Sequence, residues 1–483
     1  MSITRYTIDK NRITIVVLIM IILSGYSAFN NMPRQEDPGF VIRIAQVMTI
    51  LPGASPERIE NLVTDPIEKV VQQMPELDIV TSESLTGLSL VYVQIKKNYK
   101  NMRPIWDNLR RKVEAAGGNL PQNIIGPIVN DEFGDVFGII LTTTGEGYSY
   151  AELKEVADQV RNDLLHIPDV AKVDIYGAQE ERIFIEYSNA RLAQLGLSPY
   201  ILNQILSSQN ILFPGGNIST GDERIELEPT GSYESLEELR KTVIGLPGSG
   251  EMVYLGDIAN IRRGYVDPPR SKMRSSGIPA LGIGISVRDG GNIIQMGELV
   301  RAKMDYLREV YPIGIEFDEI IFQPDIVKDS VDDFLNNLMQ AVALVILVML
   351  IALGLRTGFV VATLIPATIM LTFLLMQAFG MTINTMSLAA LMIALGMLVD
   401  NAIVMSESIL VSIREGKKPV DAAVDSAKEL KAPLLIASLT TAAAFLPIAL
   451  AESETGEYCI DLFKVITIAL ISSWVLSLTM IPL

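Results

Sequence analysis

The sequence has almost none of the residues from which metal and disulfide sites are built. In 483 residues it holds one cysteine, Cys459, and one histidine, His166. A disulfide framework needs paired cysteines and a transition-metal site needs clustered His and Cys, so neither is expected, and His166 is read as a structural residue of an amphipathic helix. The net charge of −17 excludes a general polyanion-binding surface, and nucleic acid is not expected as a partner.

Catalytic motifs are also missing. The sequence has no Gly-rich Walker-type loop, no Gly-x-Ser-x-Gly and no pairing of a nucleophile with a general base. We therefore expect that the chain is not an enzyme, does not hydrolyse ATP and needs no cofactor.

Charge is scarce as well, at 20 % of residues, while mean hydropathy is +0.34. Apolar stretches of about 18 residues or more are long enough to cross a bilayer as helices. The first could be a cleaved signal peptide, but no small-x-small cleavage site follows it, so an uncleaved anchor is predicted. The six predicted spans are 13–30, 335–355, 359–379, 386–413, 433–451 and 464–483.

The flanking charges predict the orientation. If the segments 1–12 and 414–432 are cytoplasmic, most basic residues near the membrane lie inside, as the positive-inside rule requires. The loop 380–385 has no basic residue, and the loop 452–464 has only Lys464. The large region between the first two spans is therefore predicted to be extracytoplasmic.

That region predicts an α+β fold. Residues 31–135 show a β-α-β-β-α order, and similar elements recur in 136–175 and 276–334, interrupted by a turn-rich insertion at 176–275. Split β-α-β units of this kind predict ferredoxin-like subdomains, the second of which carries a separate small domain. The overall fold class is a polytopic α-helical membrane protein with a large extracytoplasmic α+β region.

Two acids lie inside one predicted span. Asp400 is near the middle of 386–413, where an ionised carboxylate costs roughly 2.5–3.5 kcal/mol. Glu407 returns to the same helix face about 10 Å further along the axis, which suits a proton relay. Asn401 points about 100° away from Asp400 and can form hydrogen bonds but cannot titrate. Alternatively, Asp400 is a structural polar residue and Glu407 reaches the cytoplasmic surface.

The sequence Gly396-Met-Leu-Val-Asp-Asn-Ala-Ile-Val404 with Glu407 resembles the fourth transmembrane helix of resistance–nodulation–division (RND) transporters. The stretches 379–385, 52–54 and 442–447 are also similar to that family. The resemblance covers the whole chain as the N-terminal half of such a transporter, closest to the multidrug (hydrophobe/amphiphile) branch.

The resemblance implies a function and partners. Family members are multi-pass proteins of the bacterial inner membrane, assembled as trimers. Proton flux drives export of amphipathic small molecules from a periplasmic porter domain, through an adaptor protein and an outer-membrane channel. Membrane lipid surrounds the helices, and the proton motive force replaces any cofactor. The insertion at 176–275 would be the docking subdomain.

The resemblance also assigns residues. Asp400 would carry the proton and Glu407 would be a second acid on the path. Asn401 stands where the drug-exporting branch often has a second consecutive acid, and Ala394 stands where the metal-exporting branch has an acid, so metal export is disfavoured. Phe137 and Tyr176 fall where drug exporters place pocket aromatics, although aromatics in strands are also common core residues.

A charged Asp400 needs a counter-charge or hydration. The apolar stretches 335–355, 359–379, 386–413, 434–451 and 465–483 contain no Lys, Arg or His. We therefore expect that a second six-helix half supplies a Lys or Arg facing Asp400. The alternatives are a truncated or split subunit that is inactive alone, and an RND-like subunit for lipid handling, protein export or metal efflux.

Overall fold

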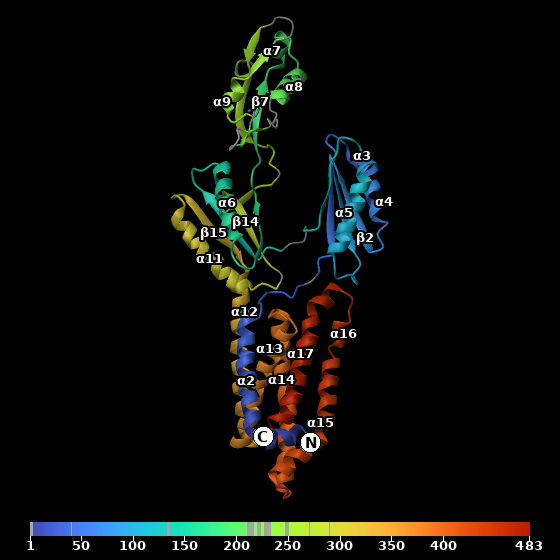
Figure 1. Cartoon of the computed structure of the whole chain (residues 1–483), viewed down its shortest axis with the longest axis vertical. Helices are drawn as coiled ribbons and strands as arrows, with labels where there is room; N and C mark the ends of the chain where they lie inside the picture. The colour runs from blue at the N-terminus through green and yellow to red at the C-terminus, as the bar shows by residue number, and fades with distance from the viewer. Residues whose placement is uncertain are drawn as a thin grey trace.

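The chain is elongated, with a helical bundle at one end, two α/β units side by side above it and a third unit beyond them (Figure 1). The computed structural model describes residues 3–39, 41–132, 136–209, 217–219, 224–226, 233–246, 251–269, 271–288 and 290–483. Both termini lie in the half of the bundle that is remote from the α/β units (Figure 1).

Five of the described helices are long and apolar enough to cross a membrane. The short α1 (Ile3–Asp9) precedes the first of them. The five spans lie in α2 (Asn11–Asn31), α12 (Gln323–Leu353), α13 (Leu355–Ala378), α14 (Thr385–Arg414) and α17 (Glu454–Thr479).

The stretch predicted as a span at 433–451 is not one helix. It is divided between the end of α15 (Pro419–Ala443) and the short α16 (Leu446–Ala449), which begins with a proline in its first turn. The first half of α15 carries Asp421, Asp425, Lys428 and Glu429, so α15 as a whole is not among the five apolar spans, although it packs against α14 and α17. The expectation of six membrane spans is therefore not confirmed.

The bundle is held by close packing of small and aromatic residues. A Cβ on Gly25 of α2 would lie 2.2 Å from the backbone oxygen of Met370 of α13, so only glycine lets these two helices approach this closely. Nearby, the rings of Phe29 and Phe373 lie 5.0 Å apart, and Phe334 packs edge-on against Phe373. These contacts join the first span to α12 and α13.

The first α/β unit, subdomain 1, follows α2. Its antiparallel sheet has the strand order β2-β3-β1-β4, and α5 and the helical segment α3-η1-α4 pack on one face. The alternating burial of β3 places Val91, Val93 and Ile95 in the core beneath Trp106 and Leu109 of α5. Its elements are β1 (Ile44–Ile50), α3 (Pro56–Ile59), η1 (Glu60–Thr64), α4 (Asp65–Val71), β2 (Leu77–Leu85), β3 (Leu88–Ile95), α5 (Arg103–Gly117) and β4 (Ile125–Asn130).

The second unit, subdomain 2, is a five-stranded sheet in the order β13-β14-β5-β15, with β6 also paired to β14. Leu281, Ile283 and Ile285 of β14 are buried beneath α6 and α11, so Gly282 and Gly284 lie on the opposite face. Its elements are β5 (Ile139–Gly145), α6 (Tyr150–Leu164), β6 (Val170–Tyr176), β13 (Met273–Ser275), β14 (Ile278–Val287), α11 (Ile293–Val310) and β15 (Ile315–Phe322).

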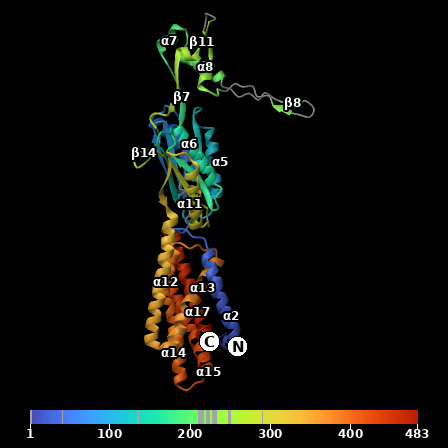
Figure 2. The same cartoon turned by 90° about the vertical axis from the view of Figure 1, so that its left-hand side faces the viewer.

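The third unit is inserted into subdomain 2 and lies at the far end of the molecule (Figure 1). The antiparallel pair β7–β12 connects it, and β8 stands well away from its body (Figure 2). Its elements are β7 (Glu181–Tyr187), α7 (Asn189–Gln194), α8 (Pro199–Gln209), β8 (Asn217–Ser219), β9 (Arg224–Glu226), α9 (Leu236–Arg240), β10 (Val243–Gly245), β11 (Met252–Tyr254), α10 (Leu255–Ile258) and β12 (Ala259–Tyr265).

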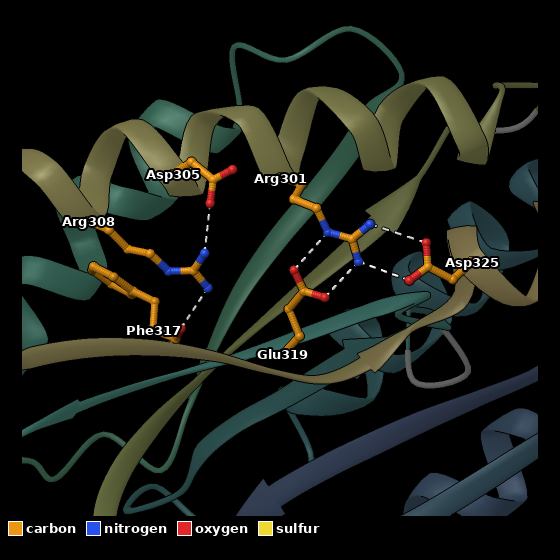
Figure 3. A network of polar contacts seen from close by, with 6 residues as sticks. All are labelled: Arg301, Asp305, Arg308, Phe317, Glu319 and Asp325. Carbon is orange, nitrogen blue, oxygen red and sulfur yellow. Dashed lines mark hydrogen bonds and ion pairs between the residues drawn. The ribbon is translucent and has the colours of Figure 1, made fainter.

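Subdomain 2 is clamped to the start of α12. The Arg301 guanidinium on α11 donates to Glu319 of β15, at 3.0 and 2.8 Å, and to Asp325 of α12, at 3.2 and 2.9 Å (Figure 3). It also lies 3.9 Å from the ring centre of Phe322. Hydrogen bonds with Glu319 and Asp325 raise the pKa of Arg301. The sheet and α12 are thus joined by one permanently charged side chain.

Candidate functional site

Helix α14, which carries the predicted relay residues, is anchored at its first turn. The Asn384 side chain accepts a hydrogen bond from the Ser387 amide at 2.8 Å, and Ser387 Oγ in turn accepts from the Asn384 amide. The same Asn384 donates through Nδ2 to Asp461 of α17 at 2.9 Å. This capping box fixes both where α14 begins and how it sits against α17.

Asp400 and Glu407 lie on one exposed stripe of α14. The stripe runs through Ile393, Gly396, Asp400, Val404, Glu407 and Val411, all of them exposed in this chain. The opposite face carries Ala394, Leu398, Ala402 and Met405, all buried against other helices. The two acids therefore share one face, as their spacing predicts, and no other described helix of this chain covers that face.

Asn401 faces the other way. Its side chain is buried, at 5 % exposure, and its Nδ2 lies 3.3 Å from Ser438 Oγ of α15 and 3.3 Å from Ser473 Oγ of α17. Ser473 in turn donates to the Leu398 carbonyl at 2.8 Å. The structure thus separates Asn401 from the two acids and makes it a hydrogen-bonding centre between three helices.

Sequence reasoning missed the role of Ser473. It is one of three buried serines near the middle and end of α17, together with Ser472 and Ser477. Of these, Ser472 Oγ has no hydrogen-bond partner among the described residues, and neither has Ser406 Oγ on α14. The Ser472-Ser473 pair within an apolar span was the available signal, because small polar residues mark helix contacts in membranes.

The two candidate pocket aromatics lie together on subdomain 2. The rings of Phe137 and Tyr176 are 5.7 Å apart and nearly perpendicular, at 83°. A Cβ on Gly284 would lie 2.9 Å from the Tyr176 ring and 3.0 Å from the Phe137 ring. The pair therefore rests on the sheet face that α6 and α11 do not cover, and Tyr176 remains 44 % exposed.

Other residues of this face were not predicted. The Met273 sulfur would lie 2.4 Å from a Cβ on Gly282, and Lys172 Nζ is 5.9 Å from the centre of the Phe137 ring. Lys172 also forms an ion pair with Asp174 at 3.2 Å. The glycines at 282 and 284 were the missed signal, because glycine inside a strand marks a place where another group approaches closely.

In the described part of the chain, no group of three or more His, Cys, Asp or Glu side chains could hold a metal ion. Ala394, at the position where the metal-exporting branch has an acid, is fully buried in the bundle.

A model of the AcrB/AcrD/AcrF family matches residues 3–483. The multidrug resistance protein MdtC of Yersinia enterocolitica serotype O:8 is 28 % identical over 476 residues, which is 97 % of this chain and 46 % of the relative. MdtC of Escherichia coli O139:H28 gives the same values, and MdtC of Yersinia pseudotuberculosis serotype O:1b is 27 % identical over 474 residues. The chain thus spans about half the length of the curated relatives it matches.

Proposed function

Since the chain belongs to the AcrB/AcrD/AcrF family of RND transporters, we propose that it is the N-terminal half of a proton-driven exporter of amphipathic small molecules. It works in the bacterial inner membrane, with its α/β units in the periplasm. In this proposal the protein is a secondary active transporter and not an enzyme.

The observation that carries this proposal is the uncovered stripe of α14. Asp400 and Glu407 lie on that stripe, while Asn401, the neighbour of Asp400, is hydrogen-bonded inside the bundle. Two carboxylates facing away from their own bundle in an apolar layer require a partner surface that hydrates or pairs them. The proposal makes Asp400 the proton carrier and Glu407 a second acid on the same path.

A second six-helix half supplies the partner surface. The MdtC relatives are about twice as long as this chain, which leaves length for such a half. The second half places a Lys or Arg opposite Asp400, because an ionised carboxylate in an apolar layer needs a counter-charge. Protonation of Asp400 then removes its attraction to that cation and changes the packing of the two halves.

The substrate surface is the aromatic face of subdomain 2. Phe137, Tyr176 and Met273 offer apolar and polarisable contacts, and the Lys172–Asp174 pair offers charge of both signs beside them. Such a face suits amphipathic molecules. In the complete assembly the transporter is a trimer that passes its substrate to an adaptor protein and an outer-membrane channel, with the inserted unit as the docking subdomain.

The test is Asp400→Asn in cells that produce this chain with a second half. Asn is nearly isosteric but carries no titratable proton, so we expect loss of export and of substrate-dependent proton uptake at unchanged protein amount. Glu407→Gln should have a milder effect. Asp421→Asn, at the charged start of α15, is the matched control and should export normally. If the Asp400→Asn variant exports substrate at the wild-type rate, the proposal is refuted.

A further inference from the structure

The segment between α2 and β1, here called the strap (residues 33–39 and 41–43), lies across the top of the bundle (Figure 1). It pairs with the turn before α14: the Ile383 amide donates to the Pro33 carbonyl at 2.9 Å, and the Thr385 amide donates to the Glu36 carbonyl at 3.0 Å. The Glu36 carboxylate accepts from Gln323, the first residue of α12, at 2.5 Å. The strap thus contacts the ends of several membrane helices before it enters subdomain 1.

The strap ends in a partly buried ion pair with α17. Arg43 donates through both terminal nitrogens to the two carboxylate oxygens of Glu457, at 2.9 and 2.5 Å. The Arg43 side chain is only 3 % exposed, and that of Glu457 is 21 % exposed. A two-pronged arginine–carboxylate contact of this kind fixes orientation as well as distance.

Arg43 is otherwise bound to its own subdomain. Its Nε donates to the Tyr99 carbonyl at 2.9 Å and its Nη1 to the Val41 carbonyl at 3.1 Å, while the Arg43 carbonyl accepts from the amide of Ile95 at the end of β3. The guanidinium is therefore a rigid part of subdomain 1. Because the Arg43 side chain is held in place by these hydrogen bonds, it cannot rotate freely when Glu457 moves.

Glu457 is likewise part of a rigid body that includes Asp400. One turn beyond Glu457 on α17, Asp461 accepts a hydrogen bond from Asn384 at the cap of α14. Ser473, about 24 Å beyond Glu457 along the helix axis, is hydrogen-bonded to Asn401, the neighbour of Asp400. Helices α14 and α17 are thus hydrogen-bonded to each other near their ends beside the α/β units and again in the middle. A shift of α14 on protonation of Asp400 moves α17 with it.

We propose that the Arg43–Glu457 ion pair is the joint through which the α14–α17 helix pair moves subdomain 1 during transport. The inference rests on the proposed proton-driven function and adds Arg43 and Glu457 as positioning residues. The joint keeps its geometry through the cycle, so subdomain 1 follows α17 as one body.

The first experiment compares Arg43→Gln and Glu457→Gln with wild type in everted membrane vesicles at matched protein amounts. It measures substrate export into the vesicle lumen and the opposite, substrate-dependent proton movement from the lumen to the cytoplasmic side, here called proton uptake. We expect export to fall by about tenfold, within the range that coupling between sites usually spans, while Asp400-dependent proton uptake continues. A purely structural role would lower protein amount, proton uptake and export together. Arg110→Gln, which breaks an ion pair with Asp131 inside subdomain 1, is the matched control and should leave export unchanged.

The second experiment replaces the ion pair with a covalent link. Arg43→Cys and Glu457→Cys are combined in a Cys459→Ser background, and a bismaleimide of matching length is added to the vesicles. The uncross-linked double variant should export as poorly as Arg43→Gln, and cross-linking should restore export. If cross-linking leaves export lost, subdomain 1 must separate from α17 during the cycle and the inference is overturned.

The outcomes also separate this inference from the proposed function. If the wild type and the Asp400→Asn variant show equal proton uptake, the proposed function is contradicted. If proton uptake depends on Asp400 but Arg43→Gln and Glu457→Gln export at the wild-type rate, only the inference about the Arg43–Glu457 joint is contradicted.

Discussion

Asn401 and Ser473 join α14 to α17 in the middle of the apolar bundle, with 3.3 Å between Nδ2 and Oγ. This contact also sets the rotation of α14 about its axis. Because Asn401 points into the bundle, the adjacent Asp400 is turned to the uncovered face.

Asn401→Ala should destabilise the bundle without abolishing proton coupling. The substitution removes two interhelical hydrogen bonds, each worth about 0.6 kcal/mol on average in membrane proteins and at most about 1.7, so we expect a loss of about 1–2 kcal/mol. Unfolding of the purified protein in detergent would measure this loss. Asp400→Asn, on the uncovered face, is the control and should unfold like the wild type. Equal stability of Asn401→Ala and wild type would contradict the assigned role.

Gly284→Val should weaken binding of aromatic compounds to subdomain 2. The added side chain meets the rings of Phe137 and Tyr176 at about the distance where contacts become repulsive, so both rings must move. We expect binding of a fluorescent aromatic dye to weaken by about tenfold, equivalent to about 1.4 kcal/mol. Gly245→Val, also in a strand but with open space around it, is the matched control. Unchanged dye affinity would remove these aromatics from the substrate surface.

Arg301→Gln should loosen the attachment of α12 to subdomain 2. The side chain is 40 % exposed, so the cost in stability should be small, about 1 kcal/mol or less. Export should fall by more than this cost explains, because α12 and the sheet no longer share a charged contact. Arg308→Gln is the control, since Arg308 lies on the same helix but binds Asp305 and the Phe317 carbonyl instead of α12 (Figure 3). Equal export by the two variants would argue against a special role for Arg301.

Reporter fusions should place the α/β units and the α14–α15 turn on opposite sides of the membrane. A fusion after Gly117, at the end of α5, should be active outside the cytoplasm, and one after Gly416 should be active inside. The chain between Gly416 and α17 includes the break between α15 and α16. A third fusion in the loop before α17 should report the outside. The same side for Gly117 and Gly416 would overturn the proposed topology.

The sequence by itself determined which residues share a face. Helical spacing places Asp400 and Glu407 on one stripe in any helical structure, because about 3.6 residues per turn is a property of the backbone. The lengths of the apolar stretches likewise indicated the helices α2, α12, α13, α14 and α17. A helix that crosses the bilayer core of about 30 Å needs such a stretch, whatever its neighbours are. These properties are local, so they can be read from a single segment.

Only the tertiary structure decided which neighbour each face meets. Periodicity cannot tell that Asn401 faces Ser438 and Ser473 while Asp400 faces outward, since that depends on how α14, α15 and α17 are rotated against one another. Nor can it pair Arg43 with Glu457, which lie 414 positions apart in the chain. Such contacts arise when packing selects one arrangement among many with similar local patterns. The residues that transmit motion between subdomain 1 and the bundle therefore became visible only in the folded chain.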